Sequence, residues 1–333
     1  MACGEDQNSS QAEQREITVA IKDSVFASKA EKRNYLKLRR VWSPSHFIYH
    51  NLPFLSVFSI ADLVDMSDWT HPRPFAVTPS EFGQLKKTSI DYILCDSNDI
   101  AILCIEFDGL QEGFSVGTDY YPSENVTAQS PWRRHILELK LRVAHGSLFP
   151  FFVVGSKQFA AIDPTLQLTI ADGIVGEVLT LRATGDRIAR GFDPKEMSYS
   201  QDGFQRLSES AQRDVIQDWL IGVEVNTKLG HNPIARERAI LDHELSITSF
   251  KVQPLEYPSP NFTADLETRA QQFRGAILFG SRVTLNTEDH GDVSADAWLP
   301  NFKSPGFSPH GLTEEIAALI ALTRLKRLRR GSG

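Results

Sequence analysis

Two short apolar segments, each carrying acidic residues, most constrain how this chain can fold. Residues 90–95 read IDYILC and residues 101–108 read AILCIEFD, and the turn-forming stretch Asp-Ser-Asn-Asp separates them. The pattern predicts a β-hairpin with a two-residue loop at Asn98 and Asp99, a register that places Asp91 opposite Glu106. Asp108 follows Glu106 by two residues, so its side chain is expected on the same face of the sheet.

This hairpin predicts a cation site. Residues that face each other on antiparallel strands have Cβ atoms about 4.5–5.5 Å apart, and like charges in such positions repel. A divalent cation removes the conflict, and Mg²⁺ prefers hard carboxylate oxygens. A solvated strand end is the alternative interpretation of the same acids. The remaining residues of both strands are apolar on both faces, as in a sheet covered on both sides in an α/β protein.

The flanking sequence predicts helices and one further strand. Ser28 and Glu31 form a capping-box pattern at the start of a helix that ends before Pro44. Apolar spacing predicts a helix over 132–145, with Gly146 as its C-cap, and then a buried strand over 149–154. Later expectations are a helix capped by Asp163-Pro164, helices over 208–225 and 236–243, strands over 246–252 and 276–285, and an amphipathic helix over 313–330 that ends in basic residues.

Composition narrows the class of protein. The chain has 333 residues with ordinary apolar content and a net charge of −7, so binding to a polyanion would depend on local basic patches. Three cysteines form neither a disulfide framework nor a zinc motif. The first residues have no apolar leader core, and no apolar run is long enough to span a membrane, so we expect a cytoplasmic protein without a membrane partner.

Asp91, the run Glu106-Phe107-Asp108-Gly109 and the later helix with Lys140 resemble the PD-(D/E)XK nuclease superfamily. They are most similar to its very-short-patch-repair-like branches and to a related uncharacterised bacterial domain family. The resemblance implies an α/β restriction-endonuclease-like core at residues 24–160, with a central mixed sheet flanked by helices. Residues 1–23 are then a disordered tail, and residues 161–333 are a C-terminal α+β extension of unknown fold.

The resemblance also implies roles for individual residues. Asp91 and Glu106 would bind Mg²⁺ or Mn²⁺, with Asp108 as an additional ligand where the superfamily often has lysine. Lys140 would then supply the positive charge that acts together with Glu106 in catalysis. Glu31 is either a further site residue or only a helix cap, and Arg133 and Arg134 are candidates for phosphate binding. Three features depart from the relatives: no histidine follows Asp108-Gly109 closely, the loop over 110–131 is longer than usual, and no Arg-Asp pair precedes Lys140.

These expectations together describe a magnesium-dependent phosphodiester hydrolase. It would act on DNA, with RNA as a second candidate, through water activated by the metal. The alternative is a catalytically inactive module of the same fold that binds nucleic acid or a protein partner. The net charge and the missing histidine favour this alternative.

Overall fold

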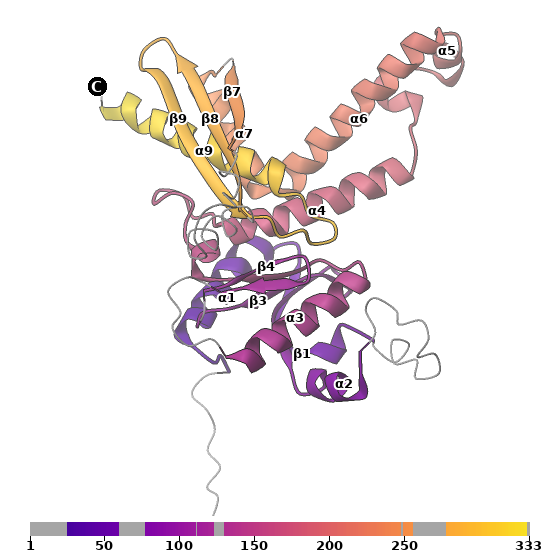
Figure 1. The fold of residues 1–333 in the computed structure, drawn as a ribbon. Helices are drawn as coiled ribbons and strands as arrows, with labels where there is room; N and C mark the ends of the chain where they lie inside the picture. Colours follow the sequence, from indigo (N-terminus) through magenta and orange to yellow (C-terminus); the bar gives the residue numbers. More distant parts are fainter. Residues whose placement is uncertain are drawn as a thin grey trace, which may run out of the picture.

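The computed structural model describes residues 25–59, 77–110, 112–122, 130–247, 249–255 and 278–331. The protein is a mixed α/β structure, and these residues form eight α-helices, a four-stranded mixed sheet and a C-terminal three-stranded antiparallel sheet. Figure 1 shows the four-stranded sheet at one end of the molecule and the three-stranded sheet at the other, with helix α4 (Ile170–Ala189) between them. The predicted tail, residues 1–23, lies outside the described residues.

The four-stranded sheet has the order β1-β2-β3-β6. The first three strands are antiparallel, whereas β6 runs parallel to β3, as a crossover through a helix requires. The predicted hairpin of β2 and β3 and the predicted strand near 149–154 are therefore confirmed. The strands are β1 (Phe47–Pro53), β2 (Ser89–Cys95), β3 (Ala101–Phe107) and β6 (Phe151–Val154).

The hairpin has the predicted register but a different loop. Tyr92 pairs with Ile105 and Ile93 with Cys104, which is the register expected from the sequence. The predicted two-residue loop is wrong, because β2 ends at Cys95, which pairs with Ala101, and a bulge follows Leu94. The side chain of Asp96 accepts hydrogen bonds from two backbone N–H groups of the longer loop, at 2.8 and 3.0 Å. The bulge compensates for the added loop residues and so restores the register.

Helices α1 (Lys29–Trp42) and α3 (Pro131–Gly146) cover opposite faces of this sheet. Leu38 and Trp42 of α1 belong to one apolar cluster with Tyr92, whereas Leu137 and Leu139 of α3 belong to a second cluster on the other face. The capping box of α1 is confirmed, since Ser28 Oγ accepts a hydrogen bond from Glu31 N–H at 3.0 Å and the Glu31 side chain accepts one from Ser28 N–H at 3.3 Å. The α3 prediction is also confirmed, except that Gly146 is still helical and Ser147 is the C-cap.

Short elements surround the two helices. They are the 3-10 turns η1 (Phe54–Ser56) and η3 (Ser156–Phe159), helix α2 (Pro79–Leu85), and a small hairpin of β4 (Phe114–Val116) and β5 (Asp119–Tyr121). The hairpin lies within a segment that the sequence analysis treats as a loop. Its strands have three residues each, too few for the apolar alternation that identifies a strand.

The second half of the chain contributes four long helices and the second sheet. Helix α4 begins after Thr169, not after Asp163, because Thr169 and Asp172 form its capping box. The predicted helices near 208–225, 236–243 and 313–330 and the predicted strands near 246–252 and 276–285 are confirmed with shifted ends, and β9 is an addition. The elements are η4 (Pro194–Met197), α5 (Gln201–Gln205), α6 (Glu209–His231), α7 (Pro233–Leu245), β7 (Phe250–Leu255), β8 (Leu278–Thr287), β9 (Gly291–Pro300) and α9 (Pro309–Gly331).

One apolar cluster connects both halves of the chain. It contains Leu38 of α1, Leu103 of β3, Val175 of α4 and Leu319 of α9, so α4 covers the same face of the first sheet as α1. Gly173 allows the close approach of the helices, because a Cβ atom there would lie 2.6 Å from side-chain atoms of Ile234 and Leu312. Residues after 161 therefore complete the core of the first sheet.

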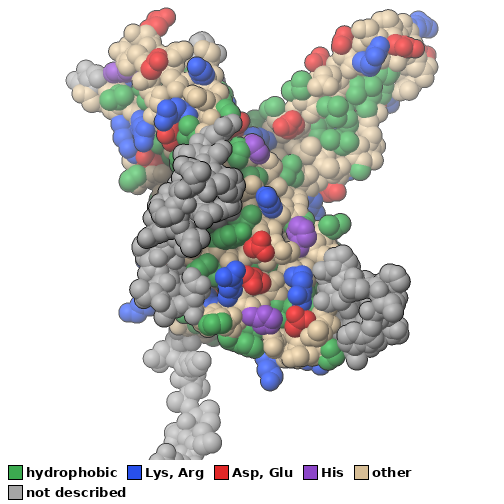
Figure 2. Space-filling view, viewed as in Figure 1, with side chains coloured by type: hydrophobic (Ala, Val, Ile, Leu, Met, Phe, Trp, Pro, Cys, Tyr) green, Lys and Arg blue, Asp and Glu red, His purple; other side chains and the backbone are tan. Residues whose placement is uncertain are grey.

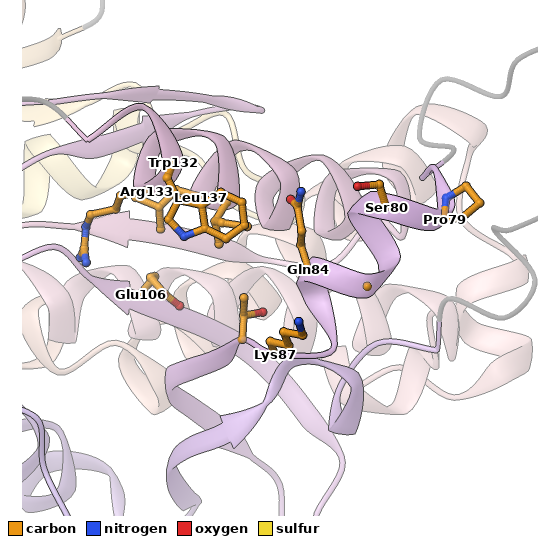
Figure 3. Close-up of a pocket in the computed structure, with 11 residues that line it drawn as sticks. Pro79, Ser80, Gln84, Lys87, Glu106, Trp132, Arg133 and Leu137 are labelled. Atoms are coloured by element: carbon orange, nitrogen blue, oxygen red, sulfur yellow. The ribbon is translucent and has the colours of Figure 1, made fainter. Parts of the chain in front are cut away.

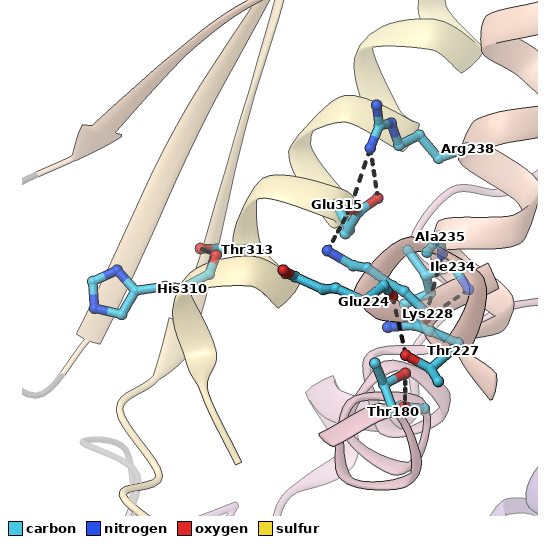
Figure 4. A network of polar contacts seen from close by, with 12 residues as sticks. Thr180, Glu224, Thr227, Lys228, Ile234, Ala235, Arg238, His310, Thr313 and Glu315 are labelled. Atoms are coloured by element: carbon cyan, nitrogen blue, oxygen red, sulfur yellow. Dashed lines mark hydrogen bonds and ion pairs between the residues drawn. The ribbon is translucent and has the colours of Figure 1, made fainter. Parts of the chain in front are cut away.

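A buried polar network joins the C-terminal helices (Figure 4). Glu315 Oε1 of α9 forms ion pairs with Lys228 Nζ of α6 at 2.8 Å and with Arg238 Nη1 of α7 at 3.2 Å. Glu315 is buried, and the two cations compensate its charge, which fixes α9 against α6 and α7. None of the helices in the described parts of the chain combines the length and the apolar character needed to cross a membrane.

Candidate active site

The two acids of the hairpin lie together at one end of the first sheet. The observed register, continued by one residue beyond Tyr92 and Ile105, brings Asp91 opposite Glu106. Asp91 Oδ2 accepts a hydrogen bond from the backbone N–H of Phe107 at 2.8 Å, which holds its carboxylate beside β3. Burial, and next the nearby Glu106 carboxylate, raise the pKa of Asp91 to about 8, although the Phe107 N–H and Lys140 oppose the shift.

Lys140 reaches this pair of acids from helix α3. Its Nζ donates to Glu106 Oε1 at 2.7 Å and to the backbone carbonyl of Ser89 at 2.7 Å. Lys140 is only 3% exposed and Glu106 only 8% exposed, so this is a buried ion pair. The other oxygen of Glu106, Oε2, is buried without a hydrogen-bond partner among the described residues. The structure therefore brings together Asp91, Glu106 and Lys140, as the sequence predicts.

Asp108 does not join the other two acids. The strand β3 ends at Phe107, and the side chain of Asp108 accepts hydrogen bonds from Tyr120 Oη and, at 3.1 Å, from Gly113 N–H. Asp108 Oδ1 also forms an ion pair with Arg133 Nη2 at 3.1 Å, and the residue is fully buried. Within the described ranges, no group of three or more His, Cys, Asp and Glu side chains is arranged to hold a metal ion. The predicted cluster of three carboxylates is therefore wrong, because the β4–β5 hairpin binds the third.

The two arginines predicted to bind phosphate differ in their ion-pair partners and in their distance from the acids. Arg133 is held by Asp108 and lines a pocket next to Glu106, so its charge faces the candidate site. Arg134 instead pairs with Glu138 one turn further along α3 at 2.7 Å, an exposed pair of ordinary surface type. Only Arg133 is thus placed beside the acids.

A pocket of about 650 Å³ opens onto Glu106 between α2 and α3 (Figure 3). Its wall combines polar groups with the indole of Trp132, which is 58% exposed. The lining includes Gln84, Lys87, Trp132 and Arg133, and Figure 3 shows Gln84 and Lys87 on the side of the pocket opposite Arg133. Sequence reasoning did not single out Trp132, Gln84 or Lys87, because only packing shows which helix residues face a shared pocket.

Glu31 has a structural role in the first turn of α1. Its Oε2 accepts hydrogen bonds from the N–H groups of Ala27 and Ser28, at 2.8 and 3.3 Å, and its Oε1 pairs with His50 Nε2. Both oxygens are therefore occupied by protein donors. The capping interpretation of Glu31 is confirmed, and His50 is a partner that the sequence analysis does not identify.

The raised pKa of Asp91 predicts how stability depends on pH. The folded protein keeps a proton on Asp91 up to about pH 8, whereas the unfolded chain releases it near the ordinary value of 3.8. Between these two pH values the folded state carries one proton more than the unfolded state. The free energy of unfolding should therefore fall as pH rises from about 4 to about 8. Thermal unfolding in EDTA measures this fall, which should be smaller in Asp91→Asn. Identical pH profiles of the two proteins would contradict the assignment.

No family model, no curated protein and no solved structure matches this chain. The resemblance to PD-(D/E)XK nucleases therefore stays a prediction from the residues quoted in the sequence analysis.

Proposed function

We propose that this protein is a divalent-cation-dependent phosphodiester hydrolase that acts on DNA. The observation that carries the proposal is the meeting of Asp91 and Glu106 with the ammonium group of Lys140 beside an open pocket. Two strand carboxylates and one lysine are the set of groups that the resemblance to PD-(D/E)XK nucleases implies.

The arrangement of the chain supports this resemblance. Helix α1 precedes the antiparallel strands β1, β2 and β3, with the short helix α2 between β1 and β2. Helix α3 follows these strands, and β6 then lies parallel to β3. Helices α1 and α3 lie on opposite faces of the mixed sheet, as expected for a restriction-endonuclease-like core. The acids lie on the central strands β2 and β3, and the lysine lies on α3.

The oxygen atoms present fit a hard divalent cation. Glu106 has a buried oxygen without a partner, and Asp91 carries a carboxylate whose ionisation the neighbouring acid disfavours. Asp91 and Glu106 would hold Mg²⁺ or Mn²⁺, and a bound cation relieves the repulsion between them. When bound, such a cation supplies Lewis-acid polarisation of a phosphate oxygen and lowers the pKa of water.

The remaining groups have roles in binding and orientation. Lys140 holds Glu106 in place through a charge-assisted hydrogen bond and provides positive charge next to a phosphate that develops negative charge. Arg133, oriented by Asp108, provides a second cation at the pocket wall. Asp108 is thus a positioning residue and not a metal ligand in this proposal.

The inactive-module alternative has its own supporting observation. Lys140 and Glu106 neutralise each other in a buried pair, and the third acid is bound elsewhere. Titration with Mn²⁺ separates the two functions, since a cation that binds the folded state stabilises it by about 2.7 kcal/mol at 100 times its Kd. We expect a rise in melting temperature with Mn²⁺, and no rise in Asp91→Asn.

The direct test is cleavage by the purified chain. Supercoiled plasmid, single-stranded DNA and single-stranded RNA are each incubated with Mg²⁺ or Mn²⁺, and in parallel with EDTA. We expect cation-dependent cleavage of DNA. Cleavage of RNA alone would overturn the substrate class, and no cleavage of any of the three would overturn the enzymatic function.

A further inference from the structure

Helix α1 carries a concentrated positive charge in a protein that is acidic overall. Six of its 14 residues are Lys or Arg, and its one acid, Glu31, is buried beneath the surface. Five of the six cations line a shallow groove of about 480 Å³, together with Leu36. The basic face of α1 is defined here by these five residues, Lys29, Lys32, Arg33, Lys37 and Arg40.

Acidic side chains in the described parts of the chain do not neutralise this charge. Within the described ranges, none of the basic residues of α1 forms an ion pair, while Lys37 and Arg40 donate only to the backbone carbonyls of Phe159 and Gln167. The acid behind them, Asp172, is fully buried and accepts hydrogen bonds from Trp42 and Thr169. Burial first, and then Arg33 and Arg40, lower the pKa of Lys37, as expected where like charges are crowded.

The other strongly basic helix, α9, provides an internal comparison. Its Lys326 pairs with Glu244 at 2.5 Å, its Arg329 pairs with Asp289 at 2.8 Å, and its Arg327 pairs with Asp163. On the face of the molecule seen in Figure 2, acidic, basic and histidine side chains also alternate over the region of α3. Local neutralisation of this kind removes most of the long-range field of three of the five cations of α9. The cations of α1, which have no ion-pair partner among the described residues, remain the stronger attraction for an anion.

The spacing of these cations suits an extended polyanion. Lys29, Arg33, Lys37 and Arg40 recur at intervals of one helical turn, and eleven residues of α-helix extend about 16 Å. One nucleic-acid strand presents a phosphate about every 3.4 Å along its axis, so the row matches several consecutive phosphates. A membrane surface fits less well, because the apolar side of α1, with Leu38 and Trp42, is buried in the core.

We propose that the basic face of α1 binds the phosphate backbone of a nucleic acid. This surface is separate from the pocket beside Glu106, because α1 and α3 cover opposite faces of the sheet. The proposal rests on the proposed function for the identity of the polyanion. It adds that binding affinity comes from phosphate contacts on α1, without sequence preference.

The test measures binding and cleavage separately. Fluorescence anisotropy with a labelled single-stranded DNA and a labelled duplex, in EDTA and over 50–200 mM salt, gives the affinity and its salt dependence. Removing three cations in Lys29→Gln/Lys32→Gln/Arg33→Gln should weaken binding about tenfold or more and reduce the salt slope by about 2–3. The matched control, Arg282→Gln/Lys326→Gln/Arg329→Gln, removes the same charge from paired positions and should have a much smaller effect.

Each outcome decides the proposal. Equal loss in the two triple variants, or no loss in the α1 variant with an unchanged melting temperature, would overturn it. Binding of the wild type to phosphatidylserine vesicles but not to nucleic acid would also overturn it. Because the binding assay contains no divalent cation, its result does not depend on whether the protein cleaves DNA. If the α1 variant cleaves DNA as fast as the wild type, only the proposed α1 surface is refuted.

Discussion

Asp91→Asn is expected to lower the rate of cation-dependent DNA cleavage by about 10²–10³-fold, equivalent to several kcal/mol of transition-state stabilisation. The substitution removes one of the two charged oxygen donors that would hold the cation. It retains an oxygen that accepts the hydrogen bond from Phe107 N–H. The loss should therefore report on the charge and not on the position of strand β2.

This variant is also expected to fold. Burial and Glu106 keep Asp91 protonated in the folded protein at neutral pH, so the substitution replaces a neutral carboxyl group with a neutral amide of the same shape. Loss of plasmid conversion with an undiminished melting temperature in EDTA is the expected result. The control is Asp119→Asn, which removes an exposed carboxylate from β5 and should leave the cleavage rate unchanged. Equal rates in wild type and Asp91→Asn would show that the cleavage has another source.

The second large effect concerns the buried pair of Lys140 and Glu106. Lys140→Met should lower the free energy of unfolding by about 3–5 kcal/mol, because it leaves the charge of Glu106 buried without its cation. The backbone carbonyl of Ser89 also loses its donor. Urea denaturation at neutral pH measures the change, provided that the slope with denaturant stays constant.

Two further variants make this prediction specific. Arg142 lies on the same helix as Lys140, and Arg142→Met breaks its more exposed pair with Glu81 of α2. This substitution should lower the free energy of unfolding by about 1 kcal/mol or less. The double variant Lys140→Met/Glu106→Gln removes both charges and should regain a large part of the lost stability. If Lys140→Met costs no more than Arg142→Met, or if the double variant is as unstable as the single one, the pair is not the buried element described above.

The parts of the candidate site that depend on residues close in sequence could be predicted from the sequence. Alternation of side chains along a strand is a strict two-residue period, so a hairpin with Asp91 opposite Glu106 follows once the register is right. The predicted loop was wrong, and the register survived because a bulge after Leu94 offsets the longer loop. Ser28 and Glu31 likewise form their capping box within three residues of each other, and no distant contact is needed to predict it.

Contacts between distant segments decided the rest of the site. The turn after β3 and the hairpin at 114–121 direct Asp108 toward Tyr120 and Arg133, away from the other two acids. The pocket requires α2 and α3 to lie side by side, and this brings Gln84 near Trp132. Neither arrangement has a periodic signal in the sequence, because each depends on where packed elements meet.

The amino-acid sequence by itself determined that residues 90–95 and 101–108 form a hairpin, which face of it bears Asp91 and Glu106, and where the first helix begins, because periodicity and capping act over a few residues. Only the tertiary structure decided which charges are neutralised. Among the described residues it paired Lys140 with Glu106, Arg133 with Asp108 and three cations of α9 with acids far away in the chain, and it gave the basic face of α1 no such partner. The physical reason is that Coulomb attraction depends on distance in space and on burial, and the folded arrangement of the whole chain sets both.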